Sequence, residues 1–261
     1  MNLSTLTQKK AAGQKLLVPY VTAGISDKWS DLVICLADAG ADAVEIGLPF
    51  SDPMIDGKII QMACKTALDA GYNTQKIFDE LRILTEKVDV PLVVMTYYNL
   101  ILARGLAKTA CDLAELGISG SIVPDLTVEE LEPWRVESST NMLDNILLIA
   151  PSTPLTRAAE IAEISTGFIY ALGLMGITGI RETLMPEAID NVEKIKSVTD
   201  KPVLVGVGIS SPNQAKEASK YSDGVVVGSA LVKLILDNAG DIELNKKVFN
   251  FVRTFKEAIG E

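Results

Sequence analysis

The sequence predicts an α/β fold, a single (β/α)8 TIM barrel with an extra N-terminal helix and a short extra helix after the eighth strand. Apolar, strand-like runs alternate eight times with helix-like segments, which indicates a parallel sheet with right-handed crossovers. A chain of 261 residues has the usual length of one such barrel. The alternative is a doubly wound open sheet, but no G-x-G-x-x-G fingerprint follows the first strand. We therefore expect one domain over residues 1–261.

The expected elements follow one another in regular order. Residues 2–13 form a short amphipathic helix that we expect to plug one end of the barrel. Strands are expected at the buried apolar runs, namely residues 16–21, 41–46, 91–96, 120–124, 145–150, 166–172, 202–207 and 223–227. Helices are expected at residues 28–39, 57–70, 74–87, 106–116, 128–137, 156–164, 186–198, 211–221, 230–237 and 243–259. Gly40, Gly71 and Gly117 directly follow three of these helices, as is typical of helix ends.

Composition excludes several classes of function. The formal net charge of −10 argues against nucleic acid or an anionic membrane surface as a partner. The chain has no histidine, so Ser-His-Asp catalysis and histidine-ligated metals are excluded, and other side chains must transfer protons. No signal-like or membrane-spanning apolar run occurs, which predicts a cytoplasmic protein. Three cysteines without metal-type spacing are expected to lie buried in helices, in a reducing compartment.

Carboxylates concentrate in residues 44–57, at and directly behind the second strand. Glu45 closes an otherwise apolar run, where burial of an unpaired charge is costly. Two prolines and a glycine prevent a regular helix from following, so Asp52 and Asp56 must lie on a shaped loop. Both aspartates also suit ordinary turns. However, Glu45 and Asp56 facing each other across a cleft would differ in proton affinity, as an acid and base pair requires.

Glycine-rich loops follow the last three predicted strands, at residues 176–179, 206–210 and 228–230. In barrels of this class, loops after the seventh and eighth strands and the start of a short helix commonly bind phosphate through backbone amides. One such loop alone would be read as a turn, but three at the expected places predict a phosphate site without Arg or Lys. Ser229 is expected to cap the short helix or contact phosphate. Thr178, between two glycines, suggests a hinged lid.

With these motifs, the chain resembles the tryptophan synthase alpha subunit family over nearly its whole length. The matching segments are residues 19–24, 45–53, 56–57, 60–61, 95–99, 124–126, 150–154, 176–179, 206–210 and 227–230. The resemblance implies retro-aldol cleavage of indole-3-glycerol phosphate to indole and glyceraldehyde 3-phosphate, in L-tryptophan biosynthesis, by a carbon–carbon lyase without metal or organic cofactor. It also implies a pyridoxal-phosphate beta subunit as partner in an alpha2beta2 heterotetramer, near Asp52, Pro53 and a loop at residues 98–100.

The resemblance also implies roles for individual residues. Glu45 would be the general acid and base that protonates the indole ring carbon and handles the glycerol hydroxyl proton. Asp56 would stabilise the cationic intermediate at the indole nitrogen, Tyr170 would orient Glu45 or the substrate, and Thr178 would secure the lid through Asp56. The indole pocket would be lined by residues that also suit an ordinary barrel interior: Tyr20, Ile60, Met95, Ile122 and Val207. The phosphate would be held by Gly179, Gly208, Gly228 and Ser229.

Some positions depart from the commoner family pattern. Gly173, Leu174 and Met175 stand where a Ser-Arg pair usually precedes the lid, while Lys58 and Thr127 stand where proline is more usual. A stand-alone indole-releasing lyase therefore stays an alternative. Another is a different phosphate-binding barrel, such as indole-glycerol-phosphate synthase or an isomerase of phosphoribosyl substrates, although that synthase would need a lysine on an early strand. A regulatory subunit that only binds a phosphoester is the non-enzymatic alternative.

Overall fold

The chain closes into the predicted (β/α)8 barrel. The structure is a computed structural model that describes residues 2–173, 186–206 and 208–260. Within these residues, the strands form one closed parallel barrel in sequence order. They are β1 (Leu16–Thr22), β2 (Val44–Gly47), β3 (Leu92–Met95), β4 (Gly120–Ile122), β5 (Asp144–Ile149), β6 (Ile169–Leu172), β7 (Val203–Gly206) and β8 (Gly224–Val227). The predicted fold class is therefore confirmed.

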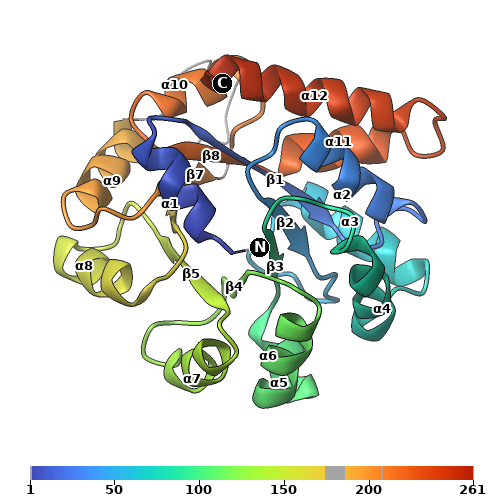
Figure 1. The fold of residues 1–261 in the computed structure, drawn as a ribbon, viewed down its shortest axis with the longest axis horizontal. Helices are drawn as coiled ribbons and strands as arrows, with labels where there is room; N and C mark the ends of the chain where they lie inside the picture. Colours follow the sequence, from blue (N-terminus) through green and yellow to red (C-terminus); the bar gives the residue numbers. More distant parts are fainter. Residues whose placement is uncertain (1, 174–185, 207, 261) are drawn as a thin grey trace.

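Helices surround this barrel, as Figure 1 shows. They are α1 (Ser4–Ala11), α2 (Trp29–Asp38), α3 (Lys58–Asp69), α4 (Thr74–Leu84), α5 (Tyr98–Arg104), α6 (Leu106–Glu115), α7 (Glu132–Thr140), α8 (Leu155–Ile164), α9 (Pro186–Lys196), α10 (Pro212–Ser219), α11 (Ser229–Asp237) and α12 (Leu244–Ile259). Gly40, Gly71 and Gly117 follow α2, α3 and α6 with positive φ, as predicted for helix ends. None of the described helices is long and apolar enough to cross a membrane.

Three expectations about these elements are wrong. Residues 98–100 are not a loop but the first turn of α5, because the Asp125 carboxylate accepts the Tyr98 N–H at 2.9 Å and satisfies the start of the helix. The helix expected at residues 128–137 starts later, at Glu132, because residues 127–131 form tight turns with a hydrogen bond from Glu130 N–H to the Thr127 carbonyl. Finally, the three cysteines are not all buried, since Cys111 is exposed.

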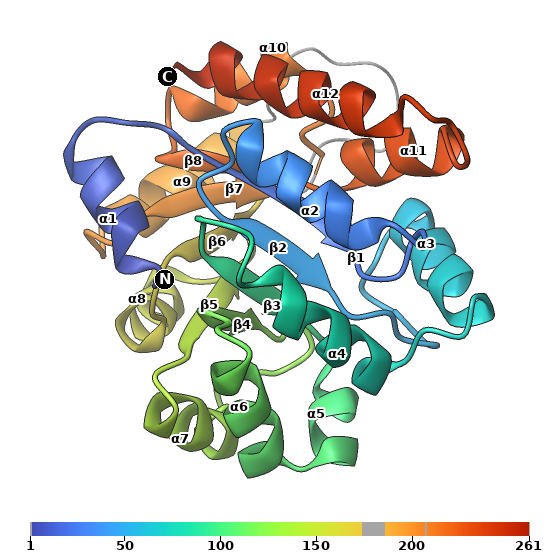
Figure 2. The ribbon, with the colours of Figure 1, turned by 45° about the vertical axis from the view of Figure 1, so that its right-hand side comes forward.

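The N-terminal helix plugs the barrel, as predicted. Leu3, which precedes α1, and Leu6 within it have no exposed surface and pack into the interior cluster of strand side chains. In Figures 1 and 2 this helix and the N-terminus lie against one end of the strands. The plugged end is the N-terminal end of the strands, because Leu16 at the start of β1 belongs to the same cluster. The opposite end, where the strands finish, is left to the functional site.

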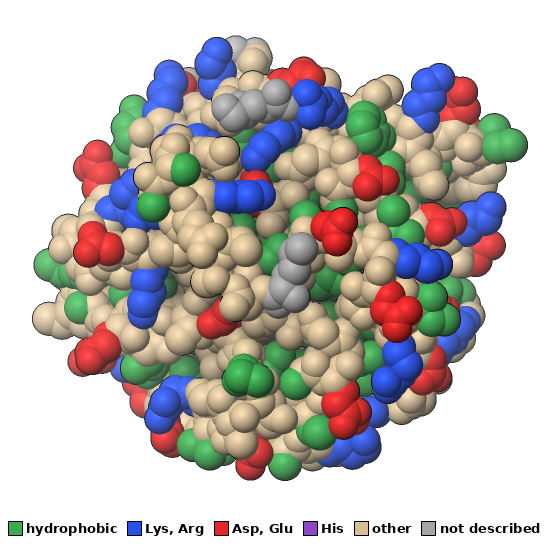
Figure 3. All heavy atoms as spheres, in the orientation of Figure 1, with side chains coloured by type: hydrophobic (Ala, Val, Ile, Leu, Met, Phe, Trp, Pro, Cys, Tyr) green, Lys and Arg blue, Asp and Glu red, His purple; other side chains and the backbone are tan. Residues whose placement is uncertain are grey.

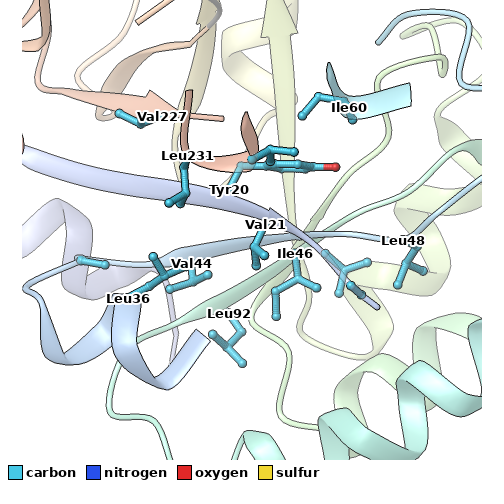
Figure 4. Packing of buried hydrophobic residues seen from close by; sticks show 14 of the residues in the cluster. Tyr20, Val21, Leu36, Val44, Ile46, Leu48, Ile60, Leu92, Val227 and Leu231 are labelled. Carbon is cyan, nitrogen blue, oxygen red and sulfur yellow. The ribbon is translucent and has the colours of Figure 1, made fainter. Parts of the chain in front are cut away.

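Each strand buries one set of side chains inside the barrel and the other set on its outer side. Alternate residues of a strand point to opposite faces, so β1 sends Tyr20 into the barrel and Val21 outward. Figure 4 shows Val21 among outward-facing Val44, Ile46 and Leu92, with Tyr20 on the other side of β1. This alternation lets polar groups occur at inward positions near the strand ends without disturbing the outer core.

A buried aspartate ties the plug to the barrel. Asp42 is 3% exposed and accepts hydrogen bonds from the Leu17 N–H at 2.7 Å, Lys9 Nζ at 2.6 Å and Lys256 Nζ at 2.7 Å. These donors belong to β1, α1 and α12. On the face of the molecule that carries α1, basic and acidic side chains are interspersed (Figure 3). Asp42 therefore joins three elements with a carboxylate whose oxygens are both satisfied.

Replacing Asp42 with alanine should lower the free energy of unfolding by about 3 kcal/mol. The change removes the acceptor of the Leu17 N–H and leaves Lys256 with the Lys15 carbonyl but no carboxylate. The matched control is Asp69→Ala, which removes the exposed Lys65–Asp69 pair on α3 and should cost below about 1 kcal/mol. Urea unfolding of both variants measures the difference. Equal losses would contradict a structural role for Asp42.

Candidate active site

A cavity opens at the C-terminal ends of the strands, where barrels of this class carry their sites. Its volume is about 260 Å³. The walls combine apolar side chains with two carboxylates and a glycine-rich rim, and no Lys or Arg is among the described lining residues. They are Tyr20, Glu45, Ile55, Asp56, Gly57, Ile60, Met95, Ile122, Pro124, Leu148, Tyr170, Leu172, Gly208, Ile209, Ser210, Val226, Gly228, Ser229 and Ala230.

Glu45 lies at the floor of this cavity, pointing inward from β2 opposite Tyr20 of β1. It is 2% exposed, and its Oε2 has no hydrogen-bond partner in the described part of the chain. Burial, together with the negative charge of Asp56, raises the pKa of Glu45 to about 8. An isolated buried carboxylate without a cation prefers to keep its proton. Glu45 is therefore able to donate a proton near neutral pH.

Asp56 is held differently, on the acidic loop (residues 48–57) between β2 and α3. The Tyr97 hydroxyl donates to Asp56 Oδ2 at 2.8 Å, and Gln61 Nε2 donates to the Asp56 carbonyl at 2.8 Å. Burial raises the pKa of Asp56, and the hydrogen bond from Tyr97 opposes that rise. The two carboxylates thus differ in environment, because Asp56 has a donor to its carboxylate and Glu45 Oε2 has none.

Two glycines make room for the tyrosines that border the cavity. A Cβ on Gly47 would overlap the Tyr20 hydroxyl, and a Cβ on Gly206 would overlap the Tyr170 ring and hydroxyl. The Tyr20 hydroxyl pairs with Thr22 Oγ1 at 3.2 Å. Burial, followed by the charge of Glu45, raises the pKa of Tyr170 well above its usual value. Tyr170 is therefore a neutral hydroxyl in the same cavity as Glu45.

The rim of the cavity is built by the ends of β7 and β8. Gly208 has a φ of +88°, in the region that favours glycine. A Cβ on Gly228 would make only ordinary contact, 3.7 Å from Tyr20, so the space beside it is open. Of the two expectations for Ser229, capping of the short helix is wrong, because Ser229 is the first residue of α11 and Gly228 is its N-cap. In the described part of the chain, no side chain caps this helix. The first backbone amides of α11 therefore point at the rim without a side-chain partner.

The structure gathers most of the predicted site residues around one cavity. Besides Glu45 and Asp56, those found there are Tyr20, Ile60, Met95, Ile122, Tyr170, Gly208, Gly228 and Ser229. Thr178, Gly179 and Val207 lie outside the described residues. Among the lining residues missed by the sequence argument, Leu148 and Val226 follow the two-residue alternation of their strands and were detectable from it. Tyr97, behind Asp56, had no comparable signal.

Comparisons with known proteins identify the family of the chain. The family model described as Tryptophan synthase alpha chain matches residues 6–260. The chain belongs to this family. A tryptophan synthase alpha chain from Geobacter sulfurreducens is 40% identical over 258 residues, which are 98% of this chain and 97% of that protein.

Solved structures of the family share the fold. The tryptophan synthase subunit alpha from Legionella pneumophila superposes with a TM-score of 0.90 at 29% identity, covering 99% of this chain and 98% of that one. A tryptophan synthase chain from M. tuberculosis gives a TM-score of 0.86 at 31% identity and covers 98% of both chains. Family membership confirms the predicted function, the alpha reaction of tryptophan synthase, and with it a lyase of tryptophan biosynthesis.

Proposed function

We propose that this chain cleaves indole-3-glycerol phosphate with Glu45 as acid and base and Asp56 as the anionic stabiliser. The observation that carries the proposal is the pair of carboxylates that face one largely apolar cavity in different environments. Such a pair separates an acid that keeps its proton near neutral pH from a group that ionises more readily. The apolar walls suit an indole ring, and the glycine-rich rim suits a phosphate.

The proposed reaction has two proton transfers. Protonated Glu45 gives its proton to the indole carbon that carries the glycerol chain, and the ring becomes a cation. Asp56 accepts a hydrogen bond from the ring N–H and stabilises that charge. The Glu45 carboxylate then removes the proton of the neighbouring glycerol hydroxyl. The aldehyde forms, the carbon–carbon bond breaks, and its electron pair restores the aromatic ring, so Glu45 ends protonated and no metal or organic cofactor is needed.

The remaining predicted residues are assigned to binding. Tyr170 is proposed to orient Glu45 or the reacting hydroxyl from the opposite wall. Tyr20, Ile60, Met95, Ile122 and Val207 are proposed to enclose the indole. Gly179, Gly208, Gly228 and Ser229 are proposed to hold the phosphate through backbone amides and the Ser229 hydroxyl, helped by the start of α11. Thr178 is proposed to secure the lid.

A beta subunit is the proposed partner, in an alpha2beta2 complex. Met54 and Ile55 on the acidic loop are 88% and 55% exposed, and Leu102 on α5 is also exposed. Apolar side chains placed in water on a functional loop are typical of an interaction surface. Because Asp56 lies on the same loop, docking there would act on the reaction.

A cytoplasmic location is proposed from the free cysteines.

The direct test is release of indole from indole-3-glycerol phosphate by the purified chain, alone and then mixed with a beta subunit. Slow release that accelerates on mixing is the expected result for a subunit of a coupled complex. Fast release by the chain alone would favour the stand-alone lyase. That alternative is motivated by Gly173, Leu174 and Met175, which stand where family members usually have a Ser-Arg pair. No release under either condition would contradict the proposal.

A further inference from the structure

Tyr97 contacts the acidic loop at three points from behind. Its hydroxyl donates to Asp56 Oδ2 at 2.8 Å and accepts the Ile55 N–H at 3.2 Å. Its ring stacks on Phe50, with centroids 5.0 Å apart and an angle of 29° between the planes. Tyr97 is 5% exposed and does not line the cavity. It therefore supports the loop from the protein side and leaves the ligand side of Asp56 open.

The loop depends on this support. Inside it, backbone hydrogen bonds run from Met54 N–H to the Asp52 carbonyl at 2.8 Å and from Asp56 N–H to the Pro53 carbonyl at 3.1 Å. The Ser51 hydroxyl also donates to Asp52 Oδ2 at 2.6 Å, and none of these three bonds holds the Asp56 carboxylate. Residues 51–57 are exposed or half-buried, so this part of the loop has little burial of its own. Among the described residues, Tyr97 is the hydrogen-bond donor to the Asp56 side chain. The rotamer of that carboxylate thus rests on a single hydroxyl.

Tyr97 is itself fixed by the start of α5. It is the N-cap residue of this helix, and the next N–H, that of Tyr98, donates to both carboxylate oxygens of Asp125, at 2.9 and 3.2 Å. Asp125 follows β4. The backbone just before Tyr97 is also tied to that strand, because the Thr96 N–H donates to the Ile122 carbonyl at 3.0 Å. A rigid strand end therefore sets the position of the tyrosine.

We propose that Tyr97 is a positioning residue for the alpha reaction: it holds Asp56 Oδ2 so that Oδ1 stays available to the substrate, and Asp125 fixes Tyr97 through the first turn of α5. This inference rests on the proposed role of Asp56. It adds two residues that touch neither the cavity nor the substrate. Both act through the placement of one carboxylate, so their removal should change how Asp56 titrates as well as how fast the enzyme works.

Loss of the Tyr97 hydrogen bond should change the pKa of Asp56 in a definite direction. The groups that face Asp56 are Tyr97 and, from β1, β2, α3 and β6, Tyr20, Glu45, Cys64 and Tyr170. Each has a raised pKa and none is a cation. The hydrogen bond from Tyr97 is the contact that lowers the pKa of Asp56 against its burial. Without that bond the pKa of Asp56 should rise further, and the acid limb of the kcat/KM profile should move to higher pH.

The test compares Tyr97→Phe, which keeps the ring on Phe50, with Tyr221→Phe, a tyrosine next to the start of β8 at the plugged end. Tyr97→Phe should lower kcat/KM about 10- to 100-fold and shift the acid limb upward, while Tyr221→Phe should change neither. An unmoved limb with kcat/KM within about twofold of the parent would overturn the inference. A loss of thermal stability with an unmoved limb would reduce Tyr97 to a packing role and overturn it too.

A second measurement does not depend on turnover. NMR titration of carbon-labelled aspartate in the ligand-free chain should report a higher pKa for Asp56 in Tyr97→Phe than in the parent, and an equal pKa would overturn the inference. If the parent released no indole, the proposed function would fail while this titration still decided the role of Tyr97. Asp125→Asn, which keeps an oxygen acceptor for the Tyr98 N–H, should preserve the parent profile, and Asp125→Ala should shift it.

Discussion

Glu45→Gln is expected to abolish indole release and to yield a folded protein. A positioned acid and base contributes about 10²- to 10⁴-fold to a rate, and glutamine can neither give nor take the proton. The substitution preserves size and shape, so the cavity and its apolar walls should stay intact. Indole release measured beside circular dichroism separates chemistry from folding. Turnover near that of the parent would contradict the assigned mechanism.

The same variant should reveal how much stability the proposed catalytic carboxylate of Glu45 costs the folded protein. Burial raises the folded-state pKa of Glu45 from its usual 4.5 to about 8. Above pH 4.5 the unfolded chain releases a proton that the folded chain retains, so the parent loses stability as the pH rises toward 8. Glutamine does not titrate. The variant should therefore gain stability relative to the parent, by on the order of 5 kcal/mol at pH 9 and little at pH 4.

Urea unfolding of both proteins at pH 4, 7 and 9 measures this difference. A constant offset across that range would mean that Glu45 titrates normally in the folded chain. It would also remove the physical basis for its role as an acid near neutral pH.

Gly228→Asp is expected to weaken substrate binding strongly without unfolding the chain. Gly228 is the N-cap of α11 at φ −108° and ψ −87°, outside the left-handed region that favours glycine, and its neighbourhood accepts a Cβ. Aspartate is a favourable N-cap residue. A carboxylate at this point would, however, lie next to the proposed phosphate, and two like charges about 4 Å apart repel by roughly 4 kcal/mol near a protein surface. KM should therefore rise at least about 100-fold.

The matched control is Gly228→Asn, which has nearly the same shape, is an equally good N-cap and carries no charge. It should raise KM much less than Gly228→Asp, with similar thermal stability for the two variants. If asparagine and aspartate weakened binding equally, bulk rather than charge would be responsible. The proposal of a phosphate site at the start of α11 would then lose this evidence.

The sequence was sufficient for the architecture because the barrel repeats one simple pattern. Buried parallel strands read as apolar runs, and glycine marks the helix ends at Gly40, Gly71 and Gly117. Sequence patterns did not predict α5, because this helix begins with the help of Asp125, a residue 27 positions away from Tyr98. No local pattern encodes that contact. The late start of α7 has a similar cause, since turns at residues 127–131 compete with the helix.

The proposed catalytic residues could be picked out from the sequence for a different reason. A carboxylate such as Glu45 in an apolar strand is locally anomalous, and the anomaly itself indicates function. Tyr97 gives no such signal, because a tyrosine after a strand is ordinary. Its importance comes from the hydrogen bond with Asp56, 41 positions earlier in the chain. Sequence reasoning therefore found the groups proposed to do chemistry and missed the group that holds one of them in place.

The pH dependence of kcat/KM for indole release distinguishes buried Glu45 from any other proton donor. Activity is expected to fall as the pH rises through about 8, because Glu45 with its raised pKa then loses the proton that it must donate. Activity should also fall on the acid side, where Asp56 becomes protonated. A rate that stayed constant or increased from pH 7 to pH 10 would contradict the account, because the proton donor would then be a group other than buried Glu45.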